Sequence, residues 1–243
     1  MRTRASLQRA SADSNLVAVR LYPVPERITQ LTSAVTQEAI ELRWAPPERT
    51  TAGMPIPALG GFRIYRAEVP AEATPEGEQP TFRLLSVAPS PMFRDTQFEF
   101  GRAYVYTVRS VAQYEADSVE SADSELVRVT PRDTFPPAAP QNLVVVLVPE
   151  EAPGRAAFGL SWSISPETDL GGYHVYRSEQ SGTRGERINR ELLPVPTFRD
   201  TSVEAGGRYF YRVTAVDRAG NESPASDPVA GEVPAANGNA ARR

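Results

Sequence analysis

Hydrophobic and polar residues alternate along short stretches of this chain, and turn-forming residues separate the stretches. The plainest example covers residues 156–164, where every second position is apolar. A period of two indicates a β-strand with one buried face, because successive side chains of a strand point to opposite sides. No stretch keeps the 3.6-residue period of a helix over helical length. The pattern therefore predicts an all-β chain of short strands.

The same series of strands occurs twice. The first copy is marked by Trp44, Ile-Tyr-Arg at 64–66, Phe-Arg-Asp-Thr at 93–96 and Tyr-Val-Tyr at 104–106. The second copy has Trp162, Val-Tyr-Arg at 175–177, Phe-Arg-Asp-Thr at 198–201 and Tyr-Phe-Tyr at 209–211. A repeat of about 100 residues predicts two similar domains in series. Short strands with turns at nearly regular spacing favour a β-sandwich for each.

The domain boundaries follow from where the chain has little to bury. Both ends are rich in small and polar residues, so we expect them to be disordered. Prolines between the two copies restrict the backbone and favour a short, stiff connection. The predicted organisation is a disordered tail over 1–14, a first domain over 15–132, a Pro-rich linker and entry over 133–140, a second domain over 141–234 and a disordered tail over 235–243.

Charge and residue usage exclude several kinds of chemistry. The net charge is −4 and there is no basic stripe, so nucleic acid is not an expected partner. All 26 basic residues are arginines, which excludes lysine Schiff-base chemistry. Because the sequence has no cysteine, it has no disulfide, no thiolate nucleophile and no cysteine-ligated zinc. Each core must therefore be held by packing alone.

Neither a membrane span nor a signal peptide is predicted. The longest aliphatic run, 143–148, is far shorter than the ~20 residues needed to cross a bilayer. The arginines near the N-terminus, Arg2, Arg4 and Arg9, are not followed by an apolar signal-peptide region. We therefore expect no transmembrane segment.

The second copy carries a set of motifs that resembles fibronectin type III domains. The motifs are a Pro-rich entry (Pro136, Pro137 and Pro140), Trp162, Gly-Tyr-His-Val-Tyr-Arg at 172–177, Tyr209, and Ala-Val-Asp-Arg-Ala-Gly-Asn-Glu-Ser at 215–223. The resemblance covers about 22–131 and 137–234. The first copy departs from it through longer loops at 45–60 and 69–80 and a different turn at 113–121.

The resemblance implies an immunoglobulin-like sandwich of seven strands in two sheets for each copy. It places Trp44 and Trp162 at the centres of the two cores. It also makes Tyr104 and Tyr209 tyrosine corners, in which the ring packs in the core and the hydroxyl bonds to the backbone. These four aromatic residues are therefore expected to be structural.

Two further segments resemble the type III modules of bacterial cell-envelope proteins, including lipoproteins. They are Asp-Thr-Phe-Pro-Pro-Ala-Ala-Pro at 133–140 and Ser-Pro-Glu-Thr-Asp-Leu-Gly-Gly-Tyr at 165–173. The resemblance implies an extracytoplasmic protein, in the periplasm or at the cell surface. A lipid anchor needs an N-terminal cysteine, so we expect one only if the true start lies upstream of Met1.

The sequence offers no convergent set of reactive residues. His174 is the only histidine and lies between two inward-facing positions, so we expect it on the outer face of its strand. Asp95 and Asp200 enter a turn, where an Asp side chain bonds to nearby backbone amides. We therefore expect no catalytic residue and no cofactor.

One group of oxygen-bearing residues is a candidate calcium site. In a sandwich of this strand order, the domain entry and two loops meet at one end, close to the joint between the domains. The residues brought to this end are Asp133, Glu167, Asp169, Asp217 and Asn221. Ca²⁺ takes about six to eight oxygen ligands, and several loops can supply them. The alternative is that these residues only form turns, in which Asp and Asn are common.

A second candidate lies on the outer face of one sheet in the second copy. Alternation places His174, Tyr176, Phe210, Arg212 and Thr214 on this face. Exposed aromatic rings beside arginine can stack on a sugar ring or contact a protein. The alternative is that these cross-strand pairs only stabilise the sheet.

Three functional hypotheses follow from these patterns. The first is a non-enzymatic tandem fibronectin type III protein that acts as a spacer or protein-interaction module of the bacterial cell envelope, with a protein partner that the sequence does not name. The alternative is a carbohydrate-binding accessory module that uses the exposed aromatic sheet face of the second domain. The third is an enzyme with a site between the domains. We favour the first, because two complete cores account for nearly all patterned residues.

Overall fold

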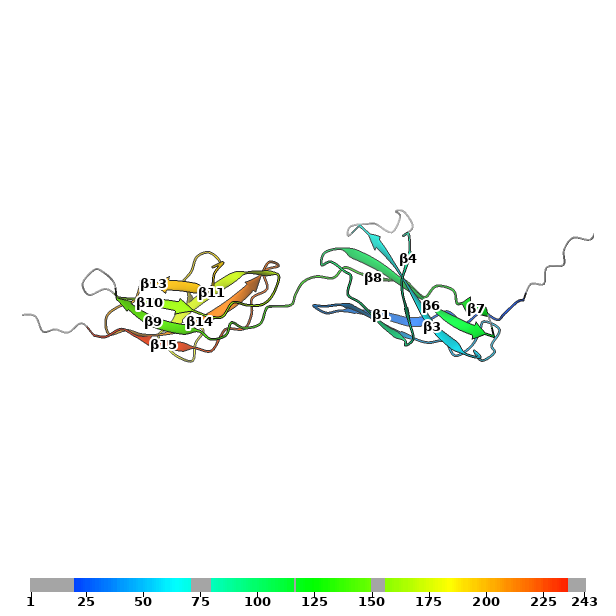
Figure 1. The fold of residues 1–243 in the computed structure, drawn as a ribbon, viewed down its shortest axis with the longest axis horizontal. Helices are drawn as coiled ribbons and strands as arrows, with labels where there is room; N and C mark the ends of the chain where they lie inside the picture. Colours follow the sequence, from blue (N-terminus) through cyan, green and yellow to red (C-terminus); the bar gives the residue numbers. More distant parts are fainter. Residues whose placement is uncertain (1–19, 71–79, 116, 150–155, 236–243) are drawn as a thin grey trace, which may run out of the picture. The chain divides into compact units, whose positions relative to one another are not determined.

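The computed structural model describes residues 20–70, 80–115, 117–149 and 156–235. The chain divides into two compact units, Met1–Pro131 and Arg132–Arg243, which we call the first and the second unit and describe separately (Figure 1). The predicted tail 1–14 lies outside the described residues, and so does the tail 235–243 apart from Ala235. The described residues form strands and no α-helix, so none of them belongs to a helix that could cross a membrane. The all-β prediction is confirmed.

The first unit is built from antiparallel strands in two sheets. Its strands are β1 (Thr29–Val35), β2 (Ile40–Ala45), β3 (Leu59–Val69), β4 (Arg83–Ala88), β5 (Met92–Asp95), β6 (Ala103–Tyr114), β7 (Asp117–Glu120) and β8 (Val127–Val129). One sheet has the order β1-β2-β5, and the other has the order β4-β3-β6-β7 with β8 also paired to β6. Both β7 and β8 pair with β6, so they are two pieces of one last strand.

The second unit repeats this architecture with a continuous set of seven strands. They are β9 (Val144–Pro149), β10 (Ala156–Ser161), β11 (Leu170–Ser178), β12 (Glu186–Arg187), β13 (Thr197–Asp200), β14 (Arg208–Asp217) and β15 (Val229–Glu232). One sheet has the order β13-β10-β9 and the other the order β12-β11-β14-β15. The predicted pair of β-sandwiches is confirmed.

Each unit has its own core between its two sheets. Trp44 and Trp162 are both 6% exposed. Trp44 packs edge-on against Phe62, and Trp162 packs in the same way against Tyr173, with 5.2 Å between ring centres in each pair. Trp44 lies in β2 and Trp162 directly follows β10, whereas their partners lie in β3 and β11 of the other sheet. Each indole therefore connects the two sheets of its unit.

Two serines explain why the last strand of the first unit is divided. After β7 the chain leaves the sheet, and serine hydroxyls replace the backbone acceptors that a strand would supply. The Ser110 N–H donates to Oγ of Ser121 and the Val108 N–H donates to Oγ of Ser124, both over 3.0 Å. The backbone of β6 therefore stays satisfied although the pairing is interrupted.

The second unit has the same device before β15. The Ala215 N–H donates to Oγ of Ser223 over 2.9 Å, and the Val213 N–H donates to Oγ of Ser226 over 3.0 Å. The repeated Ser-x-x-Ser spacing is therefore a structural feature of both units, and the sequence analysis did not detect it.

The two units differ most at the turn after β6 and β14. In the first unit β6 continues to Tyr114 and β7 returns along it, with Gln113 opposite Ser118 and Tyr114 opposite Asp117. In the second unit β14 ends at Asp217, and the chain turns back through Gly220 in the left-handed region at φ +93°. A residue with a side chain is strained at that φ, so glycine suits the tighter turn.

Candidate functional site

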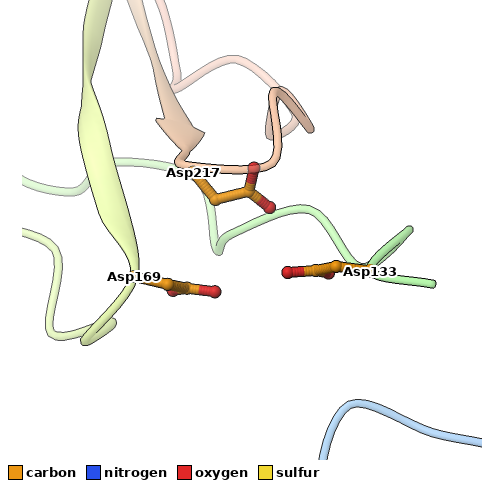
Figure 2. A group of neighbouring side chains, drawn as sticks. All are labelled: Asp133, Asp169 and Asp217. Carbon is orange, nitrogen blue, oxygen red and sulfur yellow. The ribbon is translucent and has the colours of Figure 1, made fainter. Parts of the chain in front are cut away.

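Three of the predicted calcium ligands meet at one end of the second unit (Figure 2). Asp133 lies in the segment before β9, Asp169 directly precedes β11 and Asp217 ends β14. Each supplies a carboxylate oxygen, and these oxygens lie within 4.8 Å of one another. Asp217 is only 3% exposed, whereas the other two are partly exposed. Carboxylate oxygens from separate loops are the ligands that Ca²⁺ takes, so these three residues could hold a hard cation.

Asn221 joins this group as a hydrogen-bond donor. Its Nδ2 donates to Oδ2 of Asp217 over 2.8 Å and to the carbonyl oxygen of Asp133 over 3.3 Å. Its backbone N–H donates to Oδ1 of Asp217 over 2.8 Å. The side-chain nitrogen of Asn221, rather than its oxygen, therefore faces the carboxylates. Hydrogen bonds from Asn221 offset part of the repulsion between the neighbouring carboxylates.

Glu167 lies outside this group. Its Oε1 accepts a hydrogen bond from the Ala138 N–H over 2.9 Å, which ties the loop before β11 to the segment before β9. Of the five predicted residues, three carboxylates come together. Asn221 donates to the carboxylates of Asp217 and Asp133, and Glu167 makes a separate loop contact.

The predicted aromatic face of the second unit lies on the outside of the β11–β14 sheet, but other side chains cover it. Tyr176 is only 9% exposed, because the Arg184 guanidinium lies 4.0 Å from its ring centre. Thr214 is fully buried. Phe210 is partly buried, and the Arg208 guanidinium lies 5.2 Å from its ring centre. The expectation of exposed aromatic rings is therefore wrong for Tyr176, because alternation identifies the side of a sheet but not what covers it.

The two remaining residues of that face are held by hydrogen bonds. Arg212 is partly buried, and its guanidinium donates to the carbonyl oxygens of Ser226 and Ser181 over 3.2 and 3.1 Å. His174 is partly exposed, and its ring nitrogens lie 3.4 Å from Arg187 and 3.3 Å from Asn189. Both residues thus serve contacts within the unit.

Glu222 connects the side chains of this covered face. Its Oε1 accepts hydrogen bonds from the hydroxyls of Tyr176 and Thr214, each over 2.7 Å, and forms an ion pair with Arg184. Burial by itself would raise the pKa of Glu222, but the two hydroxyl donors and the Arg184 charge outweigh it and lower the pKa. The carboxylate is therefore an ionised structural group.

The first unit has the same arrangement with a second arginine. Glu120 accepts a hydrogen bond from the Tyr65 hydroxyl over 3.1 Å and pairs with Arg109 over 3.3 Å and with Arg63. The Arg109 guanidinium also lies 4.7 Å from the Tyr65 ring centre. The sequence analysis missed both glutamates. The signal that could have found them is the repeated Glu-Ser pair, in which each Glu directly precedes the first serine of the Ser-x-x-Ser spacing.

A buried network surrounds the Asp of the corner turn in the second unit. Oδ2 of Asp200 accepts hydrogen bonds from Arg177 over 2.8 Å and from the Tyr211 hydroxyl over 2.9 Å, and Oδ1 accepts the Ser202 N–H over 2.9 Å. Burial alone would raise the pKa of Asp200, but these hydrogen bonds outweigh it and lower the pKa. Burial, reinforced by the Asp200 carboxylate, raises the pKa of Tyr211.

The first unit repeats the network around Asp95. Its Oδ2 accepts hydrogen bonds from Arg66 and from the Tyr106 hydroxyl, each over 2.7 Å, and its Oδ1 accepts the Gln97 N–H over 2.9 Å. The expected bond to a turn amide accounts for one oxygen of each Asp. The sequence analysis did not foresee the partners of the other oxygen, although the Tyr-Arg pair and the Tyr-x-Tyr motif recur in both copies.

The first tyrosine of each Tyr-x-Tyr motif joins the core to the preceding turn. Tyr104 is 1% exposed and Tyr209 is 7% exposed. The Tyr104 hydroxyl accepts the Glu99 N–H over 2.9 Å, and the Tyr209 hydroxyl accepts the Glu204 N–H over 3.1 Å. This is the geometry of a tyrosine corner.

The environment of the only histidine does not match a hydrolase site. A catalytic histidine of a Ser-His-Asp site has a nucleophile on one ring nitrogen and a carboxylate on the other. In the second unit the His174 ring nitrogens face Arg187 and Asn189 instead. Burial, together with the charge of Arg187, lowers the pKa of His174. The surroundings of His174 therefore disfavour the charged imidazolium that such a mechanism requires.

The strand order and the tyrosine corner in each unit are features of the fibronectin type III fold. A crystal structure described as a Fn3-like protein from Clostridium thermocellum shares 29% sequence identity, covers 42% of this chain and 99% of that chain, and has a TM-score of 0.35. The chain has the fold of two fibronectin type III domains in series. No family model matches this tandem protein.

Relatives of this chain include much longer bacterial enzymes. Over 202 residues the chain is 29% identical to Exoglucanase B of Cellulomonas fimi. This match covers 80% of the chain and 16% of the enzyme. Over 95 residues the chain is 38% identical to an amylopullulanase of Thermoanaerobacterium saccharolyticum. This match covers 39% of the chain and 7% of the enzyme. The chain thus spans less than a fifth of the length of these curated relatives.

Proposed function

We propose that this protein is a non-catalytic spacer and protein-interaction module outside the cytoplasm of a bacterium, where it accompanies machinery that acts on polysaccharides. The observation that carries the proposal is that the corner-turn Asp and the outer-face Glu of each unit bond to arginines and hydroxyls of the same unit. Asp200 accepts hydrogen bonds from Arg177 and Tyr211. Glu222 accepts one from Tyr176 and forms an ion pair with Arg184. Groups held in this way stabilise a sandwich and are not free to perform acid–base chemistry.

The relatives support an accessory role beside polysaccharide enzymes. By name they are an exoglucanase and an amylopullulanase, and the chain matches only a small part of each. A stretch that covers so little of an enzyme is more simply an accessory part than the catalytic part. Polysaccharides are too large to enter a cell intact, so a module that accompanies such enzymes is expected outside the cytoplasm.

Two measurements test this proposal. The purified chain should release no reducing sugar from carboxymethyl cellulose or soluble starch. Protease added to spheroplasts of the native bacterium should digest the protein while a cytoplasmic marker survives. Hydrolysis that disappears in an Asp133→Asn or Asp169→Asn variant would show that the carboxylate group in Figure 2 is catalytic and would overturn the proposal. Protection from protease until the spheroplasts are lysed would contradict the location.

A further inference from the structure

A hollow lined by two tyrosines lies on the first unit, at the end that carries the β6–β7 hairpin. The rings of Tyr22 and Tyr114 stack with their centres 4.8 Å apart and their planes 24° from parallel. The hollow has a volume of about 520 Å³, within the ~300–1,000 Å³ typical of small-ligand sites. We call it the tyrosine hollow, and its lining residues are Arg20, Tyr22, Pro57, Gln113, Tyr114 and Glu115.

Both tyrosines are fixed in place by their hydroxyls. The Tyr22 hydroxyl donates to Oδ2 of Asp117 over 2.9 Å, and the Tyr114 hydroxyl donates to the carbonyl oxygen of Pro23 over 2.7 Å. The stacked pair therefore joins the segment before β1 to the tip of the hairpin. Because the rings are already oriented, a ligand that packs on them would lose little affinity to the ordering of side chains.

Polar side chains of both charges flank the rings. Arg20 and Glu115 form a loose ion pair over 3.7 Å, and their side chains are 68% and 84% exposed. Gln113 is exposed beside them. An exposed ion pair of this length is weak, so its partners can turn toward a ligand at little cost. Arg20, Gln113 and Glu115 together offer both hydrogen-bond donors and acceptors. Because the charges of Arg20 and Glu115 are opposite, the hollow favours neither an anionic nor a cationic ligand.

We propose that the tyrosine hollow binds a segment of a neutral glucan chain. A glucose ring presents C–H groups on its faces and hydroxyls around its rim. The C–H groups are attracted to the negative face of an aromatic ring, and the rim hydroxyls match Arg20, Gln113 and Glu115 as both donors and acceptors. The choice of a glucan rests on the proposed function, because the class of polymer comes from the names of the relatives.

The second unit supplies a comparison within the same chain. At the corresponding end, where β14 turns back, the described residues bring together the carboxylates of Asp133, Asp169 and Asp217. The covered face around Tyr176 and Phe210 in that unit provides matched aromatic residues for a control.

The test is isothermal titration calorimetry of the full chain with cellohexaose and, separately, with maltohexaose. Wild-type protein should bind one or both. The Tyr22→Ala plus Tyr114→Ala variant should bind about tenfold more weakly or worse. The Tyr114→Phe variant keeps the ring and should retain most of the affinity. The Tyr176→Ala plus Phe210→Ala control should bind like wild type, since it alters rings on the second unit.

A second variant guards against a folding defect in the double tyrosine change. Gln113→Ala plus Glu115→Ala alters only exposed side chains, so it should melt like wild type and still bind several-fold more weakly. The hollow is not the site if wild-type affinity survives in both double variants. It is not a sugar site at all if neither oligosaccharide binds, or if a decaproline peptide binds in place of the sugars, as an aromatic-lined groove for a protein segment would.

These outcomes are separable from the fate of the proposed function. A chain that binds neither sugar but also hydrolyses nothing and is reached by external protease keeps its role as a spacer. Hydrolysis of starch or carboxymethyl cellulose would remove that role whatever the titrations show.

Discussion

At the end where the first unit extends β6 and β7 into a hairpin, Tyr22 stacks on Tyr114, whereas at the corresponding end of the second unit β14 stops and three carboxylates meet. Away from these ends the units are alike, and each has a tyrosine corner and a buried Arg-Asp-Tyr network. The difference shows where the fold constrains the sequence. Positions between the sheets must pack and pair, and positions at the loop end are free to take up different chemistry.

Removing the core tryptophans tests whether the two cores are independent, and we expect the largest effect here. Trp44→Ala and Trp162→Ala should each cost about 3–5 kcal/mol, through lost contact and the cavity left behind. That is a large part of the ~5–15 kcal/mol that stabilises a domain. Hydrogen exchange read by mass spectrometry should show Trp44→Ala loosening the first unit alone, and Trp162→Ala the second alone. Loss of protection in both units from either change would mean that the units do not fold separately.

The buried networks allow a sharper comparison, because their charged centre is the same in both units. Asp200→Asn removes the charge that Arg177 and Tyr211 face, and should cost about 2–4 kcal/mol at pH 7 because it leaves a mostly buried arginine without its counter-charge. Asp95→Asn should have a similar effect through Arg66 and Tyr106.

The pH dependence of Asp200→Asn has a definite sign. The folded protein lowers the pKa of Asp200, so this carboxylate stabilises the fold fully above its unfolded pKa of about 3.9, and the contribution is lost as pH falls through the lower folded pKa. Urea unfolding at pH 7 and below pH 3 should therefore show the gap between wild type and Asp200→Asn narrowing in acid. A gap that stays constant would mean that the charge of Asp200 is not what stabilises the network.

The glutamates on the outer faces should have a smaller effect that differs between the units. Glu120 pairs with two arginines, whereas Glu222 pairs with Arg184 and accepts two hydroxyl donors. Glu120→Gln and Glu222→Gln should each cost about 1 kcal/mol, since both sites are partly exposed. Thermal unfolding in low and high salt should show a stronger salt dependence of the Glu120→Gln effect, because more of it is charge pairing. Equal salt dependence would contradict that division.

The strands and their inward residues could be predicted from the sequence because the period of a strand follows from backbone geometry. Trp162 and Tyr211, for example, sit in runs in which every second residue faces the core. The partners of Asp200 could not be predicted in the same way, because Arg177 and Tyr211 reach it from other strands and the contact depends on register.

The site residues show the same limit more strongly. Alternation placed Tyr176 on the outer face but did not predict that Arg184 covers its ring. Arg184 comes from the loop between β11 and β12, and hydrophobic periodicity does not predict the path of a loop. Tyr22 and Tyr114 are far apart in the chain and neither belongs to a repeated motif, so nothing marked them as a pair. The three aspartates could be grouped because the family resemblance already placed their loops at one end.

The smallest expected change in stability comes from removing one charge of the acidic group Asp133, Asp169 and Asp217. The stacked tyrosines of the first unit carry no such charges. Asp169→Asn removes one of three neighbouring like charges, so it should stabilise the second unit by about 0.5 kcal/mol in low salt. The gain should vanish in 1 M NaCl, where screening acts over about 3 Å. Asp227→Asn, a change at an exposed carboxylate outside the group, is the matched control and should give no such gain.

Thermal unfolding in CaCl₂ and in NaCl of equal ionic strength tests whether the three carboxylates bind calcium or are only screened by salt. Equal stabilisation by the two salts means that the carboxylates are only screened, and a larger rise in calcium that Asp169→Asn abolishes means that they bind the ion.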